Sequence, residues 1–519
     1  MAQYLVDPIK SFEEIRDNYI LYIKTAFGSR FKENVDGEIS FEQEREELLR
    51  RDQVLSREPW IEPIPAYEKQ VDASGRGMTI MDFPESCFPG MTSSSISLFK
   101  EFIEKGLMSY PLYQHQYQML HQSLLGKDCV ITSGTGSGKT ESFLLPLFAD
   151  IFKEAETWPA KTGSNKYVLK KWWTLPRINE SQFLTFDSNG KGSLNPYFLQ
   201  RGNETRESAV RAIIIYPMNA LVEDQLTRLR KALDSDEVQE FLDTHMGGNR
   251  IFFGRYNSES PVAGEFIKSD DPEEEKRLKK RRTNMRKRLQ EILGDLELQS
   301  DKIDRWVNSA RDEDERRYRE DQKYTFQRIH GKDDRVSSEL RSRFDMQQTP
   351  PDILITNYSM LAIMLMRSAE SSILDKTKAW LDGETNKENP TRIFHLIIDE
   401  LHLNRGTSGT EIAYLIRLLL NRLGLSPDSK QLRILSSSAS LEGSDEKSIV
   451  FLKDFFGRDF SAENIIPGNR LDCKQTYNSS TKLPVAPFIS LKNAYRQDPL
   501  CFDRLKESGG PEQIQQVCS

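Results

Sequence analysis

The chain has few of the features that mark secreted, metal-rich or membrane-spanning proteins. Its five cysteines are scattered and never form a Cys-x-x-Cys pair, which argues against a disulfide framework or a zinc site and favours a reducing cytoplasm. No run of about 18 apolar residues is present, so the sequence predicts no membrane span. The segment from Met1 to Asp7 has neither the basic start nor the apolar core of a secretory signal.

An excess of positive charge is also missing. The 72 lysines and arginines are outnumbered by 79 aspartates and glutamates, which leaves a formal net charge of −7. The chain as a whole therefore does not attract nucleic acid, and any such binding must come from local basic surfaces. With 37% hydrophobic and 29% charged residues, the composition is typical of a globular protein, and 519 residues suffice for about three domains.

What the sequence does contain is a set of short apolar runs that predict buried strands. The runs are 129–132, 212–216, 353–356, 396–398 and 432–435. Nearly continuous β-branched runs suit strands that are buried on both faces, and helical stretches separate these five. The sequence therefore predicts an α/β fold, in which a parallel sheet has helices on both faces. Because polar residues directly follow the runs, ligands are expected at the carboxyl ends of the strands.

The rest of the chain divides into regions of different composition. We expect a helical accessory region at 1–95, the sheet domain at 96–445, and a truncated tail at 446–519 that starts a linker or a second domain. Two insertions interrupt the sheet domain, at about 152–208 and about 268–345. The second is dominated by mixed charge and predicts one or two long solvated helices.

Two features of the insertions have alternative interpretations. The basic run Lys276–Arg282 is either an ordinary solvated helix face, which is the preferred interpretation, or a grip on phosphates. Trp172 and Trp173 could stack on bases, although a core or inter-domain wedge is the preferred interpretation.

A glycine-rich loop follows the first apolar run and precedes an apolar helix, which is the context that a phosphate-binding loop requires. It reads Ser133-Gly134-Thr135-Gly136-Ser137-Gly138-Lys139-Thr140. Its glycines let backbone N–H groups face phosphates, and the helix N-terminus adds its positive end. The sequence therefore predicts that all eight residues bind ATP. We expect the Lys139 ammonium to act catalytically on the β- and γ-phosphates and the Thr140 hydroxyl to bind Mg²⁺.

Asp399-Glu400-Leu401-His402 closes the fourth apolar run. We expect Asp399 to hold Mg²⁺ and Glu400 to orient and deprotonate the attacking water as the catalytic base. His402 is expected to couple this site to Ser438-Ala439-Ser440, with Ser438 and Ser440 as its partners.

These motifs, in this order, resemble those of superfamily 2 helicases of the DEAD/DEAH group over about residues 108–442. Ser133 stands where the general phosphate loop has glycine, and this variant is typical of that superfamily. The resemblance implies a RecA-like domain that uses ATP and Mg²⁺. It also implies that Gln116, in Leu112–Gln116, contacts the adenine.

Nucleic-acid contacts are expected at the ends of other strands. By the same resemblance, Asn219 in Tyr216–Gln225 and Thr356 and Asn357 in Pro351–Tyr358 contact the sugar–phosphate backbone. Arg255 is a further candidate, with an ordinary surface arginine as the equal alternative.

The sequence motifs YPMNAL, TNYSML and DELHLNRGTSG are similar to those of the large helicase-related branch. That branch includes bacterial repair helicases and the long helicases of antiphage systems such as Druantia and DISARM. The resemblance implies nucleic acid as the partner, DNA in preference to RNA, and no membrane.

Helicases of this class use two sheet domains, and the second supplies an arginine finger in a Q-x-x-G-R-x-G-R pattern. No such pattern follows Ser440, and the 79 residues after it are too few for a domain of about 150 residues. We therefore expect the ATP-binding half of a truncated or split helicase that has weak activity alone and whose partner is a second chain with the missing domain. The alternatives are a non-enzymatic module that binds ATP and nucleic acid, an inactive remnant, or an ATPase that acts on protein.

Overall fold

The computed structural model describes residues 8–26, 41–51, 54–55, 66–134, 136–161, 171–217, 220–329, 331, 335–404, 406–439, 441 and 445–471. The chain forms two compact units, one from 1–64 with 472–519 and one from 65–471. In the first unit, helices α1 (Pro8–Ala26) and α2 (Phe41–Arg50) are joined by an ion pair between Arg50 and Asp17 at 2.7 Å. The second unit holds every described residue of the predicted sites.

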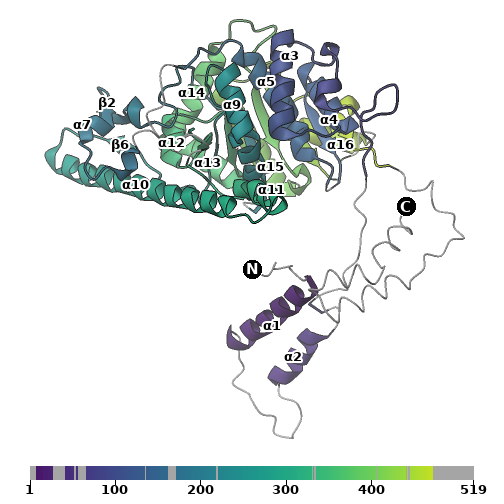
Figure 1. The fold of residues 1–519 in the computed structure, drawn as a ribbon, viewed down its shortest axis with the longest axis horizontal. Helices are drawn as coiled ribbons and strands as arrows, with labels where there is room; N and C mark the ends of the chain where they lie inside the picture. The colour runs from purple at the N-terminus through teal and green to yellow at the C-terminus, as the bar shows by residue number, and fades with distance from the viewer. Residues whose placement is uncertain are drawn as a thin grey trace, which may run out of the picture. The chain divides into compact units, whose positions relative to one another are not determined.

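A parallel sheet forms the centre of the 65–471 unit (Figure 1). Eight strands of the described residues belong to it, in the order β11-β1-β10-β9-β4-β8-β5-β7. They are β1 (Cys129–Thr132), β4 (Ala212–Ile215), β5 (Phe253–Arg255), β7 (Glu339–Leu340), β8 (Ile353–Thr356), β9 (Phe394–Ile398), β10 (Leu432–Ser438) and β11 (Ile465–Pro467). The five predicted runs are the five adjacent strands β1, β10, β9, β4 and β8, and the predicted α/β fold is confirmed.

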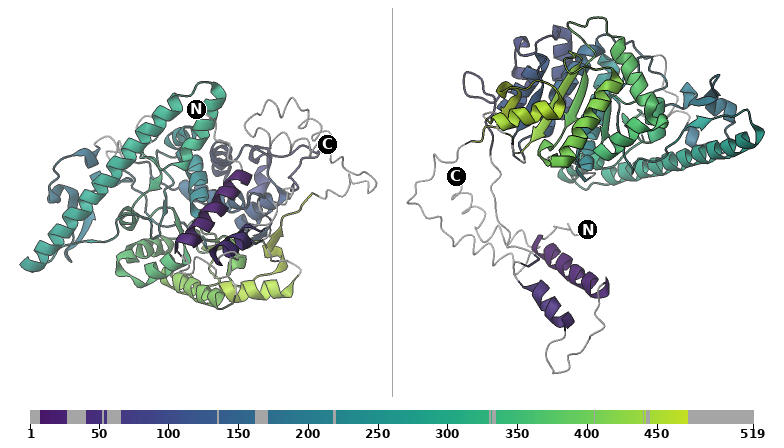
Figure 2. Two further views of the ribbon diagram at one scale, coloured as in Figure 1. Left: turned by 90° about the horizontal axis from the view of Figure 1, so that it is seen from below. Right: turned by 180° about the vertical axis from the view of Figure 1, so that it is seen from behind.

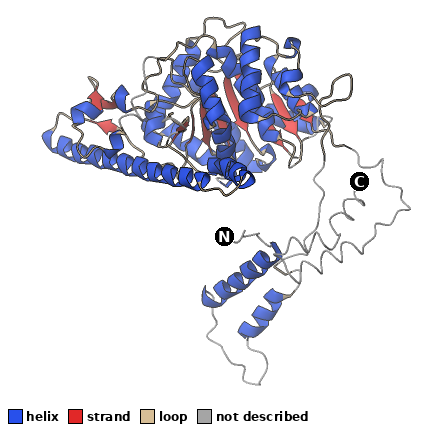
Figure 3. Cartoon of the chain, in the orientation of Figure 1, coloured by secondary structure: helices blue, strands red, loops and turns tan. Residues whose placement is uncertain are grey.

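Helices cover both faces of this sheet, because the side chains of each strand alternate between two apolar clusters (Figures 2 and 3). Ile131 and Ile214 belong to one cluster, whereas Val130 and Ile213 belong to the other. The first cluster includes residues of α3 (Ser93–Phe102), α4 (Gln114–Leu124), α5 (Lys139–Ala155), α8 (Ala220–Asp234) and α9 (Asp236–His245). The second includes residues of α13 (Tyr358–Met366), α14 (Ser371–Asp382), α15 (Gly406–Leu423) and α16 (Glu446–Phe456).

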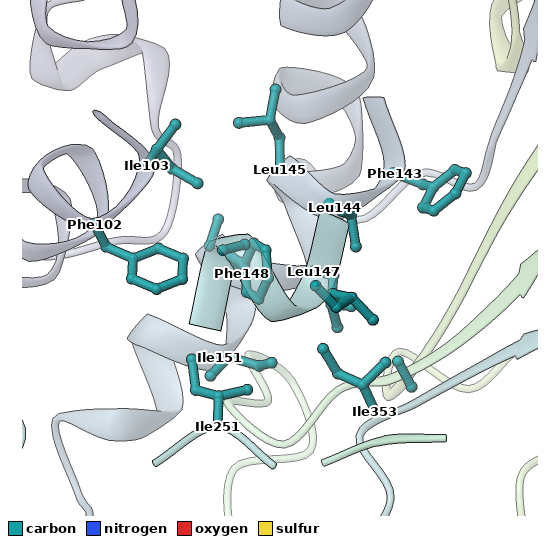
Figure 4. Close-up of a cluster of buried hydrophobic side chains, with 14 of the residues drawn as sticks. Phe102, Ile103, Phe143, Leu144, Leu145, Leu147, Phe148, Ile151, Ile251 and Ile353 are labelled. Carbon is teal, nitrogen blue, oxygen red and sulfur yellow. The ribbon is translucent and has the colours of Figure 1, made fainter. Parts of the chain in front are cut away.

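Helix α5, which begins at Lys139, is held rigidly in the first cluster. Figure 4 shows Leu147 and Phe148 of this helix between Phe102 of α3 and Ile353 of β8. The rings of Phe102 and Phe148 pack edge to face, with centroids 5.0 Å apart. Because interiors are close-packed, this burial fixes the start of α5 and with it the end of the glycine-rich loop.

The sheet domain extends further along the chain than the predicted boundary at 445. Residues 446–471 contribute α16 and β11 to the 65–471 unit, and β11 pairs with β1 at the sheet edge. Ile465 and Ile466 are buried there. Residues 65–95, which the sequence assigned to the accessory region, also belong to this unit. The strands β5, β7 and β11 have only two or three residues each, too few to stand out as apolar runs.

The two insertions pack against each other and form a small body with its own core (Figure 1). It contains α7 (Glu180–Phe183), α10 (Pro272–Asn308), α12 (Arg343–Gln348) and an antiparallel sheet of β2 (Leu184–Phe186), β3 (Lys191–Leu194) and β6 (Phe266–Ile267). The expected long helix is α10, with 37 residues, and the shorter α11 (Glu313–Gln322) follows it. Trp172 and Trp173 are buried in this core, and the Trp173 indole donates to Glu297 of α10 at 2.7 Å. The core interpretation of the tryptophans is thus confirmed.

None of the helices in the described part of the chain is long and apolar enough to cross a bilayer.

Candidate ATP site and nucleic-acid edge

The strand order brings the predicted ATP-site residues together. Strand β10 lies between β1 and β9, and the register pairs Thr132 with Ser438 and Ile398 with Ser436. All three strands run in the same direction, so the glycine-rich loop after β1, the Asp399-Glu400 pair after β9 and the end of β10 meet at one edge of the sheet.

Hydrogen bonds within the glycine-rich loop fix its curvature. The Ser133 and Ser137 hydroxyl oxygens are 2.5 Å apart, and the Ser137 hydroxyl donates to the Gly134 carbonyl at 2.9 Å. The Gly134 N–H donates to the Tyr67 hydroxyl at 3.0 Å. Gly136 has a φ of 75°, in the left-handed region that favours glycine. Thr135 lies outside the described residues.

The first turn of α4 holds the other end of the loop. The His115 Nε2–H donates to the Ser137 carbonyl at 2.7 Å, and burial lowers the pKa of His115, which favours the neutral ring. The Gln116 amide donates to the Gly138 carbonyl at 3.2 Å and accepts from the Tyr113 N–H at 2.9 Å. Gly138 must remain glycine, because it has a φ of +69° and a Cβ would lie 2.4 Å from Gln116 Nε2.

Gln116 is fully buried and both ends of its amide are bonded to the protein. In this arrangement it positions the phosphate loop, and its expected contact with adenine stays a prediction. Tyr110 and Tyr113, which the sequence reasoning did not single out, line the adjoining pocket instead.

Lys139, Glu400 and His402 form a chain of contacts across the site. The Lys139 ammonium lies 3.2 Å from Glu400 Oε1, and His402 Nδ1 lies 3.3 Å from Glu400 Oε2. Glu400 has a φ of 52°, a left-handed conformation that is rare outside glycine and is found at functional sites. The strained backbone therefore places the expected base between the expected phosphate-binding cation and the coupling histidine.

His402 also reaches the end of β10, and its coupling role stays a prediction. Its Nδ1 accepts from the Ala439 N–H at 3.4 Å. Ser438 is buried in β10 beside Thr132, and Ser440 lies outside the described residues.

Asp399 is nearly buried and is held by groups that donate to it. The Ser437 hydroxyl and the Glu400 N–H both donate to Asp399 Oδ1, the latter at 3.0 Å. Burial raises the pKa of Asp399, and the nearby Glu400 carboxylate adds to this effect, while the Ser437 hydrogen bond opposes it. The Thr140 hydroxyl, the other expected magnesium ligand, accepts from the Gln225 amide at 2.9 Å.

These groups line one open pocket of about 380 Å³. Its lining residues are Tyr110, Tyr113, Gly136, Ser137, Gly138, Lys139, Thr140, Glu141, Gln225, Arg228, Asp399 and Glu400. An ammonium, a hydroxyl and two carboxylates in one pocket are the donor set that a magnesium nucleotide needs. No group of three or more His, Cys, Asp or Glu side chains in the described residues could hold a metal alone. The Asp399 carboxylate and the Thr140 hydroxyl fit Mg²⁺, which usually takes one or two carboxylates and completes its shell with phosphate and water.

Sequence reasoning missed several residues of this pocket. Tyr113 and Gln225 stood inside the motifs that it quoted, but their contacts depend on which side chains face the loop. Ser437 precedes the expected Ser438, and strand alternation points it to the opposite face. Arg228 follows Asp224 by four residues on α8 and pairs with it at 3.1 Å, and it also pairs with Glu141.

The expected nucleic-acid residues lie at the neighbouring strand ends. Strands β4, β8 and β5 are adjacent, which places Arg255, Thr356 and Asn357 on one edge, whereas Asn219 lies outside the described residues. The buried Thr356 hydroxyl donates to the Tyr256 carbonyl at 2.8 Å, and Asn357 caps α13 by accepting from the Met360 N–H at 2.8 Å.

Arg255 is occupied by acidic partners. Its guanidinium pairs with Glu223 and, at 3.0 Å, with Glu259. The roles of these residues toward nucleic acid stay predictions.

Comparison with known proteins agrees with the resemblance that the motifs indicated. Residues 113–251 match the DEAD/DEAH box helicase family. The chain is also 31% identical over 430 residues to the Druantia protein DruE of Escherichia coli (strain UMEA 4076-1). That match covers 80% of this chain and 20% of DruE, so the chain spans about a fifth of the length of this curated relative.

Solved structures of helicases are also similar to the chain. The DUF1998 helicase MrfA bound to DNA matches with 17% sequence identity over 73% of this chain and 30% of that chain, at a TM-score of 0.34. The same helicase bound to DNA and AMPPNP matches with 15% identity over 79% of this chain and 31% of that chain, also at a TM-score of 0.34.

Proposed function

We propose that this chain is the ATP-binding part of a helicase or translocase that moves on nucleic acid, DNA in preference to RNA, in a bacterial antiphage system. One observation carries the proposal. Lys139, Thr140, Asp399 and Glu400 line a single pocket at the same sheet edge as the ends of β4, β8 and β5. The similarity to DruE supports the antiphage context.

The site residues have distinct tasks in this proposal. Magnesium-bound ATP supplies the phosphoryl group and the metal charge when it is present. The Lys139 ammonium would bind phosphate oxygens in place of Glu400, which would leave the Glu400 carboxylate able to hold and deprotonate a water. Asp399, as a carboxylate, and the Thr140 hydroxyl would hold the metal. His402 contacts both Glu400 and the end of β10, so it passes a change at the base to the sheet edge.

We further propose that the chain alone hydrolyses ATP slowly. Within the described residues, the cations that line the pocket are Lys139 and Arg228. Arg228 is paired with Glu141 and Asp224, so it does not supply a free guanidinium for the transition state. A guanidinium brought by a partner chain would meet that need, and an arginine finger is worth about 10³–10⁵ in turnover in related NTPases.

Steady-state ATPase assays with and without single-stranded DNA or RNA test this proposal. We expect magnesium-dependent ATP binding, slow turnover, and faster turnover once a protein with a second RecA-like domain is added. Glu400→Gln should then lower turnover by about 10²–10⁴ while ATP still binds. Fast DNA-stimulated turnover by the chain alone contradicts the slow-alone proposal. Full activity of Glu400→Gln favours a non-enzymatic module, and absence of salt-dependent nucleic-acid binding favours an ATPase that acts on protein.

A further inference from the structure

Helix α10 presents a basic face that the ATP site does not use. Arg277, Arg281, Asn284 and Arg288 follow one another at intervals of four, three and four residues, so they lie on one face of the helix. All four are exposed. Together with Lys280, Arg343 and the segment 258–263, they line an open groove of about 710 Å³.

The charge of this groove is almost entirely positive. Its lining holds five cationic side chains and one carboxylate, that of Glu259. Within the part of the chain that the structure describes, none of Arg277, Arg281 and Arg288 forms an ion pair with an acidic side chain. Like charges gathered without counter-charges repel one another, so the groove is suited to a polyanion.

Other basic residues of α10 behave differently, which sets the groove face apart. Arg282, the next residue after Arg281, is buried and pairs with Glu180 at 2.5 Å and Glu275 at 2.6 Å. Lys287 pairs with Glu291 at 3.7 Å along the helix surface. The basic run of α10 thus contains residues that hold the insertion together and a separate set that faces the groove.

The groove continues the sheet edge where nucleic-acid contacts are expected. Its 258–263 side directly follows β5, and Glu259 in that segment pairs with Arg255. A second hollow of about 430 Å³ shares Arg281 with the groove. Arg367, at the end of the α13 helix that Asn357 caps, also lines this hollow. Two open hollows that meet at one arginine suit an extended polymer better than a single nucleotide.

We infer that this groove binds the sugar–phosphate backbone of a nucleic-acid strand, so that the bound strand extends from the sheet edge into the groove. This inference rests on the proposed function, because it assumes that the chain engages nucleic acid. Guanidinium groups match phosphate oxygens and carry no sequence information by themselves, so binding is independent of sequence. Val262 and Met285 add apolar surface between the cations.

Two triple variants of the whole chain test the groove. Arg277→Gln, Arg281→Gln and Arg288→Gln remove three charges from the groove face, whereas Lys276→Gln, Lys279→Gln and Lys287→Gln remove three from another exposed face of the same helix. Binding of labelled single-stranded DNA and RNA of about 30 nucleotides is measured by fluorescence anisotropy over a salt series. We expect the groove variant to bind about tenfold or more weakly and to reduce the slope of log K against log salt by about 2, with little change in the control.

The outcomes separate this inference from the proposed function. Wild-type chain that binds neither DNA nor RNA contradicts the proposed function itself. Wild-type binding with an unaffected groove variant, or with equal losses in both variants, overturns the groove alone. Circular dichroism and ATP binding should be unchanged in both variants, because the substituted side chains are exposed and distant in the chain from the ATP pocket.

A photo-crosslinking pair locates the strand directly and does not depend on the charge variants. The photoreactive amino acid p-benzoylphenylalanine replaces Asn284 inside the groove or Thr283 on another face, and both positions are exposed. We expect Asn284 to yield the crosslink to single-stranded DNA and Thr283 to yield none. Equal yields, or a crosslink from Thr283 alone, contradict the inference.

Discussion

Asp399 is the proposed magnesium ligand, and its negative charge is costly to keep in the metal-free protein. Burial raises its pKa, so the ionised form of the carboxyl destabilises the metal-free protein. The hydrogen bonds from Ser437 and the Glu400 N–H offset only part of this cost. The charge of Asp399 therefore lowers the stability of the metal-free protein, although the proposed magnesium binding needs that charge.

Asp399→Asn should raise the free energy of unfolding of the nucleotide-free chain at neutral pH, because asparagine removes the buried charge and keeps an oxygen for Ser437. The raised pKa means that the folded state holds its proton more tightly than the unfolded state does. The gain should therefore shrink as the pH falls toward that pKa and the wild-type carboxyl becomes neutral. Urea unfolding at several pH values measures this. Equal stability of Asp399→Asn and the wild-type chain at neutral pH contradicts the prediction. Magnesium-dependent ATP binding should weaken in the same variant.

Gln116 is the second residue whose role can be tested. The test distinguishes a role in positioning the glycine-rich loop from a role in contacting the adenine base. The buried amide of Gln116 bonds the Gly138 carbonyl and the Tyr113 N–H. If positioning is its task, Gln116→Ala should weaken ATP and GTP binding by similar factors. Titration with fluorescent analogues of both nucleotides measures the ratio. A selective loss of ATP binding would instead support the expected adenine contact.

At the scale of secondary-structure elements, a buried ionic network anchors strand β8. Asp352, which precedes this strand, accepts from Arg206 at 2.8 and 2.7 Å and from Arg211 at 2.7 Å, and also from the Phe252 N–H at 2.8 Å. Burial raises the pKa of Asp352, but the two guanidinium groups outweigh it and hold the pKa well below its ordinary value. The network ties β8 to the segments before β4 and β5.

Asp352→Ala should lower the free energy of unfolding by about 3–5 kcal/mol, because it leaves buried guanidinium groups without their counter-charge. Asp375→Ala is the matched control. Its exposed pair with Arg422 at 2.8 Å is worth about 0–1 kcal/mol. Because the folded pKa of Asp352 is depressed, the stabilisation is present above the ordinary pKa of 3.8 and is lost as the pH falls below it. Denaturant unfolding measures the free energy of unfolding of both variants. Equal losses of stability in Asp352→Ala and Asp375→Ala contradict the prediction.

The elements that could be predicted from sequence are those with a local signal. Five strands carried short, nearly continuous apolar runs, and the glycine-rich loop and Asp399-Glu400 directly followed two of them. The strand β7 has two residues, and β11 ends in Pro467, so neither left a pattern. Contacts such as Gln225 with Thr140 join residues 85 apart in the chain, and only the folded packing decides them. The burial of Trp172 likewise depends on an insertion more than a hundred residues away.

At the scale of the whole molecule, the 65–471 unit holds both sheet cores and all the described residues of the proposed ATP pocket. A fragment of residues 65–471 should therefore fold cooperatively and bind ATP with nearly the affinity of the 519-residue chain. Calorimetric titration and thermal unfolding of both proteins measure this. Aggregation of the fragment, or ATP binding more than about tenfold weaker, contradicts it.

The shared core of the two insertions constrains how this protein arose. Phe183 and Phe198 of the first insertion pack with Leu289 and Leu293 of the second, although residues 209–267 of the sheet domain separate the two insertions. Loss of either insertion in a lineage would expose the apolar face of the other to water. Natural relatives should therefore carry both insertions or neither. An ancestor with only one insertion would have needed a polar face on that insertion in place of the apolar one.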